Sequence, residues 1–189
     1  MSTPAPFGRM LTAMVTPFKK DGSIDWDGVE KIADHLVKTG HDGIVVNGTT
    51  GEAPTTKSSE KEEIIKVVKR VVGANIKVVS GAGDNETDYS INQAKRSEAA
   101  GADGIFLEAV TDLEDYKEFK SQVDALLLAN ITEFGKTPLF TNAELASVGV
   151  DMSLYPLSAF RAMSLAAEKV YESLLKEGTQ RNVLDIMQT

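Results

Sequence analysis

The sequence predicts an α/β fold of the TIM-barrel type, with singly wound parallel strands. Short apolar runs alternate with longer amphipathic stretches along the whole chain. The runs are rich in Val, Ile and Leu without polar alternation, which is typical of strands buried on both faces of a parallel sheet. One helix-to-strand joint also occurs twice, at Thr39–Gly43 and at Ala100–Gly104. In both copies a glycine ends a helix and an Asp-Gly pair enters a strand, which predicts repeated βα units with right-handed crossovers.

The apolar runs and the amphipathic stretches give the expected elements in order. We expect six strands, at residues 10–16, 43–47, 76–81, 104–108, 125–130 and 151–155. Helices are expected between them and after the last, at residues 25–39, 58–72, 86–100, 112–124, 141–147 and 158–177. Apolar residues at helical spacing support the second helix, and Ser58 followed by Lys61 and Glu62 predicts where it begins.

The length predicts a single domain that is a partial or reduced barrel. Six βα units in 189 residues use about 31 residues each, whereas a complete eight-unit barrel takes roughly 250 residues. Six strands form either a narrower barrel or an open sheet. In an open sheet the first and sixth strands are unpaired edges, and such edges favour association between chains. We therefore expect a homodimer that protects these edges.

Composition excludes several classes of protein. The net charge is −8 and the basic residues are interleaved with acids, which argues against a nucleic-acid partner. No run of about 18 apolar residues is present, so no membrane partner is expected. The first nine residues lack the apolar segment of a secretory signal, and we expect a cytoplasmic protein. The absence of cysteine excludes disulfides, thiolate nucleophiles and cysteine-ligated metals.

The segment Asn47–Glu52 is a candidate anion site. It directly follows an expected strand, where the loops of βα folds carry function. Two glycines allow close approach of the backbone, and the hydroxyls of Thr49 and Thr50 with free N–H groups suit a small anion. From the residues alone, a site of this kind and a turn without a ligand are equally supported.

Residues 7 to about 105 resemble dihydrodipicolinate synthase, of the pyruvate-dependent aldolase family. The resemblance rests on Thr12–Phe18, Gly48–Glu52 and Val79–Gly83. It implies that Thr50 holds the carboxylate of pyruvate and that Thr49 belongs to a hydroxyl relay. The tyrosine segment of the family is replaced here by Glu108-Ala109-Val110, and the family's Schiff-base lysine belongs to a later strand without a counterpart. We found no lysine at the carboxyl end of a strand, so Schiff-base catalysis is not expected.

Residues from about 98 to 189 resemble methylisocitrate lyase, of the isocitrate lyase superfamily. The matching segments are Ala100–Asp103, Phe106–Ala109, Leu128–Gly135, Leu154–Ala162 and Glu177–Gln180. The resemblance implies substrate contacts at Glu108, Asn130, Thr132 and Arg161. Glu108 and Asn130 end neighbouring strands, and an arginine fork suits a carboxylate. From the residues alone, solvated charges at Glu108 and Arg161 are the better-supported interpretation.

The parts that this second family needs for catalysis are not found. The family binds Mg²⁺ through acids on earlier strands and uses a reactive cysteine, and here those strands are synthase-like and cysteine is absent. Asp84 follows the third strand, but one acid is too few for an octahedral site. We therefore expect no metal, no cofactor and no catalytic residue. Thr49, Thr50, Glu108, Asn130, Thr132 and Arg161 are interpreted as vestigial substrate-binding positions.

Together the two resemblances predict a chimera. Residues 1–100 would supply synthase-like βα units and residues 101–189 lyase-like units, joined within residues 98–105 at the Ala-Gly-Ala-Asp-Gly element. Our hypothesis is an engineered TIM-barrel-type scaffold without intact catalytic machinery. The alternative is a residual binder of pyruvate or a dicarboxylate with weak aldolase-type lyase activity. The lyase resemblance also implies exchange of residues 158–189 between subunits, as a second route to a homodimer.

Overall fold

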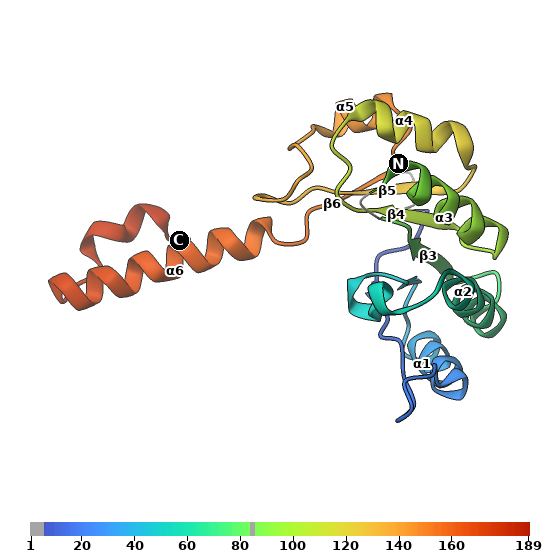
Figure 1. The fold of residues 1–189 in the computed structure, drawn as a ribbon. Helices are drawn as coiled ribbons and strands as arrows, with labels where there is room; N and C mark the ends of the chain where they lie inside the picture. Colours follow the sequence, from blue (N-terminus) through green and yellow to red (C-terminus); the bar gives the residue numbers. More distant parts are fainter. Residues whose placement is uncertain (1–5, 84–85) are drawn as a thin grey trace.

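Six strands form one sheet in the order in which they occur along the chain. The computed structural model describes residues 6–83 and 86–189 (Figure 1). Every pair of neighbouring strands is parallel, and the sheet order is β1-β2-β3-β4-β5-β6. The strands are β1 (Leu11–Ala13), β2 (Gly43–Val46), β3 (Lys77–Gly81), β4 (Gly104–Leu107), β5 (Leu126–Asn130) and β6 (Met152–Leu154). This singly wound arrangement confirms the predicted TIM-barrel-like fold.

All six predicted helices are present, close to their predicted bounds. They are α1 (Trp26–Lys38), α2 (Ser58–Val72), α3 (Thr87–Ala99), α4 (Leu113–Gln122), α5 (Asn142–Ser147) and α6 (Ser158–Glu177). Helix α2 begins at Ser58, as predicted, but its capping residue was not among the residues named from the sequence. The Glu60 carboxylate, rather than Lys61 or Glu62, caps this helix by accepting a 2.7 Å hydrogen bond from the backbone N–H of Lys57. In the described residues, three 3₁₀ helices were not predicted: η1 (Thr49–Gly51), η2 (Ala53–Thr55) and η3 (Arg181–Ile186).

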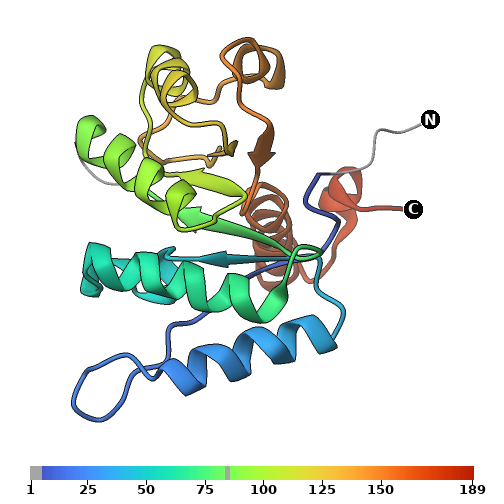
Figure 2. The same ribbon diagram turned by 90° about the vertical axis from the view of Figure 1, so that its right-hand side faces the viewer.

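The hydrophobic core lies between the sheet and the helices on its outer face. Ile44, Val78, Ile105 and Leu127 come from four neighbouring strands, and each is fully buried in the same core cluster. Helices α1 to α4 lie side by side along this face (Figures 1 and 2). Because strand residues alternate between faces, the Val/Ile/Leu-rich runs supply this core directly. Burial against α1–α4 therefore fixes the register of the central strands.

An aspartate before each even-numbered strand holds the backbone of the strand before it. The carboxylate of Asp42 accepts hydrogen bonds of 2.8 and 2.9 Å from two backbone N–H groups just before β1. Asp103 accepts 2.8 Å from the N–H of Val78 in β3, and Asp151 accepts 2.9 Å from the N–H of Leu127 in β5. The repeated joint that the sequence showed twice thus occurs three times. Its function is to align adjacent strands at their amino ends.

The sheet is open, as one of the two predicted alternatives required. Within residues 6–83 and 86–189, β1 pairs only with β2, and β6 pairs only with β5. Each of these edge strands is three residues long. Short edges present few unpaired backbone groups, which limits strand addition by a second chain. The fold is therefore a half-barrel with two short edges.

Helix α6 extends away from the sheet instead of covering it. Its 20 residues span about 30 Å, and Figure 1 shows it projecting beyond the body of the molecule. The segment after it folds back, and η3 packs along α6. The hydroxyl of Ser173 donates a 2.8 Å hydrogen bond to the carbonyl of Thr179, which fixes this return. Among the described helices, none is long and apolar enough to span a bilayer.

Candidate functional site at the carboxyl ends of the strands

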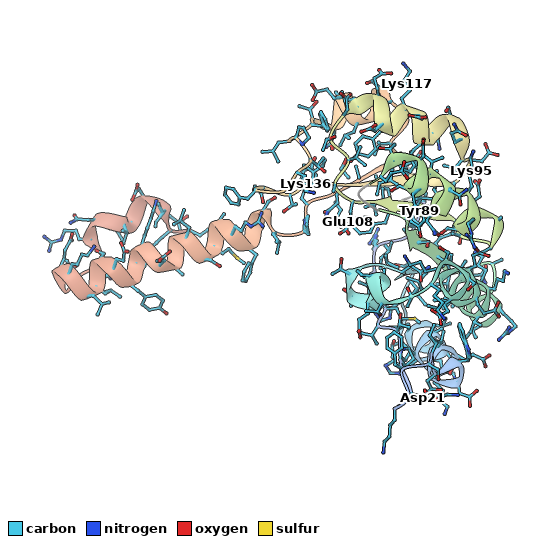
Figure 3. The ribbon with its side chains drawn as sticks, viewed as in Figure 1. Asp21, Tyr89, Lys95, Glu108, Lys117 and Lys136 are labelled. Carbon is cyan, nitrogen blue, oxygen red and sulfur yellow. The ribbon has the colours of Figure 1, made fainter. Side chains whose placement is uncertain are left out.

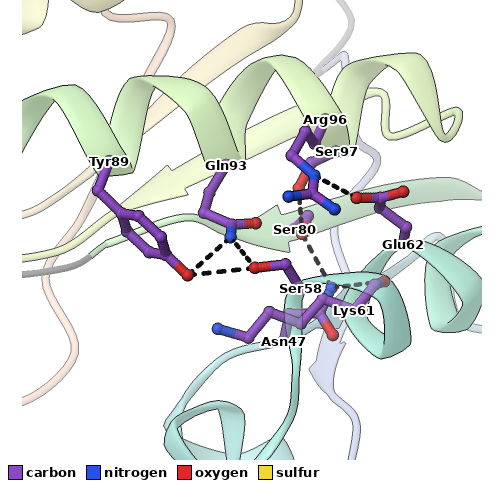
Figure 4. Close-up of polar contacts among 9 residues, drawn as sticks. All are labelled: Asn47, Ser58, Lys61, Glu62, Ser80, Tyr89, Gln93, Arg96 and Ser97. Carbon is purple, nitrogen blue, oxygen red and sulfur yellow. Dashed lines mark hydrogen bonds and ion pairs between the residues drawn. The ribbon is translucent and has the colours of Figure 1, made fainter.

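The loop after β2 is held by one buried amide. Asn47 has a left-handed backbone (φ 56°) and its side chain is buried. Its Nδ2 donates hydrogen bonds of 3.1 Å to the backbone carbonyl of Lys61 in α2 and to Oγ of Ser80 in β3. These bonds join the end of β2 to β3 and α2 (Figure 4). Asn47 therefore positions the threonine loop relative to α2.

A polar network continues from Asn47 between α2 and α3. Oγ of Ser80 lies 3.1 Å from Oγ of Ser97. Nearer the mouth of the half-barrel, the amide of Gln93 donates to the hydroxyls of Ser58 and Tyr89. These contacts, with the Arg96–Glu62 ion pair, are drawn in Figure 4. They satisfy buried polar groups and lock the two helices together, which gives the loop above them a rigid base.

Close backbone packing explains two glycines at the end of β3. A Cβ atom on Gly81 would lie 2.2 Å from the carbonyl oxygen of Asn47. A Cβ atom on Gly83 would lie 3.0 Å from Cβ of Glu108. The ends of β2, β3 and β4 therefore approach each other more closely than side chains would permit. This approach brings the loop after β2 and the loop after β4 to the same side of the mouth.

Glu108, directly after β4, lies on two adjoining clefts. The larger, of about 300 Å³, is lined by Thr49, Lys61 and Glu108 together with backbone of the loops after β2 and β3. The smaller, of about 170 Å³, is lined by Glu108 and Lys136 among others. Figure 3 shows Glu108 and Lys136 at this end of the sheet. Glu108 thus shares one cleft with Lys61 of α2 and the other with Lys136 of the loop after β5.

The two lysines were missed in the sequence, where we searched only for a lysine at the carboxyl end of a strand. Lys61 belongs to the fourth position of α2 and reaches the cleft because Asn47 holds that turn of the helix against the loop. Lys136 lies between β5 and α5, in a loop that follows a strand. Loop position was a usable signal for Lys136. No sequence signal identified Lys61 as a cleft residue, because its position in the cleft depends on the contact between α2 and the loop after β2.

A second cluster joins the loop after β5 to the first turn of α6. Nη1 of Arg161 donates hydrogen bonds to Oγ1 of Thr132 (3.1 Å), to the backbone carbonyl of Glu133 (2.7 Å) and to the Glu133 carboxylate (2.7 Å). The guanidinium also lies 5.2 Å from the ring centre of Phe134, a cation–π contact. We call Thr132, Glu133, Ser158 and Arg161 the α6 clamp. Its arginine already has a carboxylate partner.

The charge of Glu133 is stabilised within the clamp. A hydrogen bond from the Ser158 hydroxyl is the largest influence, and with the Arg161 guanidinium it holds the pKa of the Glu133 carboxyl below its ordinary value. The carboxylate is therefore ionised at neutral pH. Its bonds to Ser158 and Arg161 fix the direction in which α6 leaves the sheet.

The predicted site residues fall into two groups. Thr49 and Glu108 share the larger cleft, whereas Thr132 and Arg161 meet in the α6 clamp. Thr50 lies in η1 next to Thr49, and Asn130 lies at the end of β5. Neither residue lines either cleft. The side-chain oxygen of Asn130 is buried and has no hydrogen-bond partner in the described part of the chain.

Acidic residues do not gather in the described structure. Within residues 6–83 and 86–189, no three His, Asp or Glu side chains lie close enough together to hold one metal ion. Asp84, the acid named from the sequence, lies outside the described residues.

Comparison with known proteins assigns the chain to two families. Residues 6–111 match the model of the dihydrodipicolinate synthetase family. The chain is 51% identical over 107 residues to 4-hydroxy-tetrahydrodipicolinate synthase 2 of Streptomyces coelicolor, covering 56% of this chain and 36% of that protein. It is also 40% identical over 197 residues to 2-methylisocitrate lyase of Shewanella oneidensis, covering 96% of this chain and 68% of the lyase.

The chain belongs both to the dihydrodipicolinate synthetase family and to the 2-methylisocitrate lyases. This confirms both resemblances seen in the sequence. The chain spans only about a third of the length of the synthase relatives it matches. The lyase similarity extends across residues 98–105 into the synthetase-like half, since it covers 96% of the chain.

Solved structures confirm the barrel-type architecture. The dihydrodipicolinate synthase of Acinetobacter baumannii, crystallised with pyruvate, superposes with a TM-score of 0.73 at 27% identity, covering 84% of this chain and 59% of that one. A 2,3-dimethylmalate lyase superposes with the same TM-score of 0.73 at 20% identity, covering 82% of this chain and 57% of that one. The second likeness concerns the fold alone. Both structures share the architecture of this half-barrel.

Proposed function

We propose that the chain is an engineered half-barrel scaffold, recombined from the two families, without the catalytic machinery of either. The synthetase match ends at residue 111, and dense lyase motifs begin near residue 100. The joint at Asp103 lies where these two stretches overlap. It aligns strands in the same way as the joint at Asp42. Because this joint sets strand register at either position, units from two barrels of one architecture can meet there without displacing the sheet.

The separation of the two groups of site residues carries this proposal. Thr49 lies in the larger cleft, but the arginine that would complete a carboxylate site is bound to Glu133 in the α6 clamp. Releasing Arg161 would leave the Glu133 carboxylate without its charged partner, which is unfavourable for a partly buried pair. Although Thr49 and Glu108 share the larger cleft, Thr49 and Arg161 therefore do not converge on one substrate.

Trapping with pyruvate and borohydride tests the absence of Schiff-base chemistry. The reagent reduces an imine between a lysine and a keto acid to a stable adduct, which intact-mass spectrometry detects on a 20.3 kDa chain. We expect no adduct. An adduct on Lys61 or Lys136 would contradict the scaffold proposal. Separately, a natural gene with synthetase-like sequence before residue 98 and lyase-like sequence after residue 105 would contradict an engineered origin.

A second candidate function is binding of a small carboxylate, such as pyruvate, in the larger cleft. The observation in its favour is that Lys61 and Thr49 line the same cleft. An ammonium group and a hydroxyl are suitable donors to a carboxylate, and the fixed backbone of Lys61 limits the entropy lost on binding. Glu108 in the same cleft would favour a ligand that also carries a hydroxyl or an enol donor.

Calorimetric titration with pyruvate distinguishes the two candidates. If the cleft binds the ligand, the chain and the control variant Lys66→Met release heat, and Lys61→Met does not. Lys66 lies on the exposed side of α2, so its replacement removes the same charge without touching the cleft. Absence of heat at millimolar pyruvate from the unmodified chain would exclude the binding function and leave the scaffold.

A further inference from the structure

Asn47 and Gly48, at the start of the loop after β2, form a chemically reactive pair. They are the only Asn-Gly pair in the sequence. Asparagine is a chemically labile residue, and in an unfolded chain the backbone nitrogen of a following glycine readily attacks its side-chain amide, because glycine has no Cβ to hinder the approach. Whether this pair reacts in the protein therefore depends on how the fold holds the two residues.

The side-chain amide of Asn47 is held from two directions. Its Nδ2 donates to the backbone carbonyl of Lys61 and to Oγ of Ser80, both at 3.1 Å (Figure 4). A carbonyl only accepts hydrogen bonds, so the contact with Lys61 fixes which end of the amide carries the nitrogen. Asn47 is only 4% exposed. These two bonds therefore fix the orientation of the amide relative to its own backbone.

The peptide bond between Asn47 and Gly48 is held as closely as the side chain. A Cβ atom on Gly81 would lie 2.9 Å from the carbonyl carbon of Asn47 and 3.2 Å from the nitrogen of Gly48, so the backbone of β3 packs directly against this peptide unit. Attack on the side chain requires the peptide unit to rotate toward Cγ. The close packing against Gly81 opposes that rotation.

The oxygen of the Asn47 amide gives no help to the reaction. Oδ1 is buried and has no hydrogen-bond partner within residues 6–83 and 86–189. Attack on the amide carbon places negative charge on this oxygen, and such charge is stabilised by donors that are already in position. Because the folded site provides none, it opposes the reaction electrostatically as well as sterically.

We propose that Asn47 is a deamidation site that the fold keeps unreactive, and that it reacts only in chains in which α2 has moved away from the loop after β2. In the opened loop the nitrogen of Gly48 loses its proton and bonds to Cγ of Asn47, and the side-chain nitrogen leaves as ammonia. Water from the solvent then opens the resulting ring at either of its carbonyls. The product is aspartate or isoaspartate, with one water consumed and one ammonia released.

The modified loop cannot re-form its original contacts. A carboxylate has no hydrogen to donate, so it would face the carbonyl oxygen of Lys61, also an acceptor, in a buried position. Isoaspartate also adds an atom to the backbone where Gly81 leaves no space. Modification therefore makes the opening permanent and removes the contact that holds Lys61 at the larger cleft. Marking of opened chains goes beyond the proposed function and does not depend on it.

Peptide mapping by mass spectrometry tests whether the fold protects Asn47. The folded chain, the chain in guanidinium chloride and a synthetic peptide of residues 44–51 are incubated at neutral pH. The readouts are the mass change for replacement of NH₂ by OH and the separation of the isoaspartate form. We expect Asn47 to react at the rate of the peptide in guanidinium chloride and much more slowly in the folded chain. Asn75, which is exposed but followed by Ile76, should stay unmodified in both.

Two results of this mapping overturn the proposal. One is modification of Asn47 in the folded chain as fast as in the peptide, because the fold would then give no protection. The other is absence of modification in guanidinium chloride, because the pair would then not be reactive.

Ser80→Ala and Ser97→Ala test whether the hydrogen bonds of Asn47 provide the protection. Ser80→Ala removes one acceptor of the Asn47 amide and should accelerate deamidation of the folded chain roughly fivefold, the equilibrium ratio for one net hydrogen bond. Ser97→Ala removes a hydroxyl from the same buried network but no acceptor of Asn47, so it is the matched control. Circular dichroism confirms that both are folded. Equal acceleration in the two variants overturns the proposal.

Asn47→Asp tests whether the modification is irreversible in its effect on the fold. This variant carries one of the two products of the reaction from the start. We expect it to unfold at a lower urea concentration than the unmodified chain, because the bond to the Lys61 carbonyl is lost. A variant as stable as the unmodified chain would show that the modified loop closes again, and this result overturns the proposal.

Discussion

Helices α2 and α6 are both amphipathic, but only α2 finds its partner within the chain. Ile64, Ile65 and Val68 of α2 are almost fully buried against the sheet and α1. Phe160 and Met163 of α6 are mostly exposed although they are larger and equally apolar. The difference arises after β6, because the clamp directs α6 away from the sheet face that α2 covers. An amphipathic pattern therefore specifies a helix and a buried face, but not the surface that buries it.

The largest expected effect comes from truncating matched apolar residues on these two helices. Ile65→Ala should lower the free energy of unfolding by about 2–5 kcal/mol, because it leaves a cavity in the core. Met163→Ala should change it by less than about 0.5 kcal/mol in dilute solution, where this side chain is mostly exposed to solvent. Urea denaturation at low concentration measures both. Similar losses in the two variants would mean that α6 packs on its own sheet.

A smaller loss of stability is expected from a substitution at the carboxyl ends of β2 and β3, which approach each other closely. Gly81→Ala should destabilise the chain by about 1–3 kcal/mol, because the added Cβ would lie 2.2 Å from the carbonyl oxygen of Asn47. Gly48→Ala is the matched control, since its added Cβ would meet no atom within 4 Å. Thermal unfolding of both variants compares them. A Gly81→Ala variant as stable as Gly48→Ala would contradict the close approach of β2 and β3.

Asp103, the aspartate before β4, gives the stability of the fold a pH dependence. Partial burial alone would raise the pKa of Asp103, but hydrogen bonds from Lys69 and from the backbone of Val78 outweigh burial, so the pKa lies below its ordinary value. A lowered pKa means that the carboxylate stabilises the fold above its unfolded-state pKa of about 4, and that this contribution is lost as pH falls through the folded-state value.

Asp103→Asn should therefore cost about 1–2 kcal/mol at pH 7 and progressively less below about pH 4. Asp34→Asn is a suitable control, because its pair with Lys38 is exposed and lies within one helix. Urea denaturation of the three proteins from pH 7 to pH 3 measures the difference. A cost for Asp103→Asn that is independent of pH would show that the charge of this residue does not contribute.

The smallest expected effect concerns the anchor of α6. Arg161→Met removes the hydrogen bonds to Thr132 and Glu133, so the first turn of α6 should lose protection from amide hydrogen exchange several-fold. Arg181→Met, in η3 and outside the clamp, is the matched control. Unchanged exchange in the first turn of α6 would mean that the clamp does not hold the helix.

Local patterns were enough to predict the elements but not their surroundings. The bounds of α2 and α6 agree with their predicted ranges, because helical spacing of apolar residues is a local property. The strand-entry role of Asp151 was missed, since its joint lacks the Asp-Gly pair that marked the other two. The placement of Lys61 in the cleft and of Arg161 against Glu133 depends on contacts between distant elements, and no local pattern contains that information.

Hydrogen exchange of the unmodified chain at two protein concentrations tests the contrast between α2 and α6 most directly. If α2 is buried within each chain and α6 between two chains, protection of α2 is the same at both concentrations. Protection of residues 160–174 then increases at the higher concentration, where the homodimer expected from the sequence forms. Protection of α6 that is strong and independent of concentration would contradict the account, because the exposed apolar side chains of α6 would then be covered by their own chain.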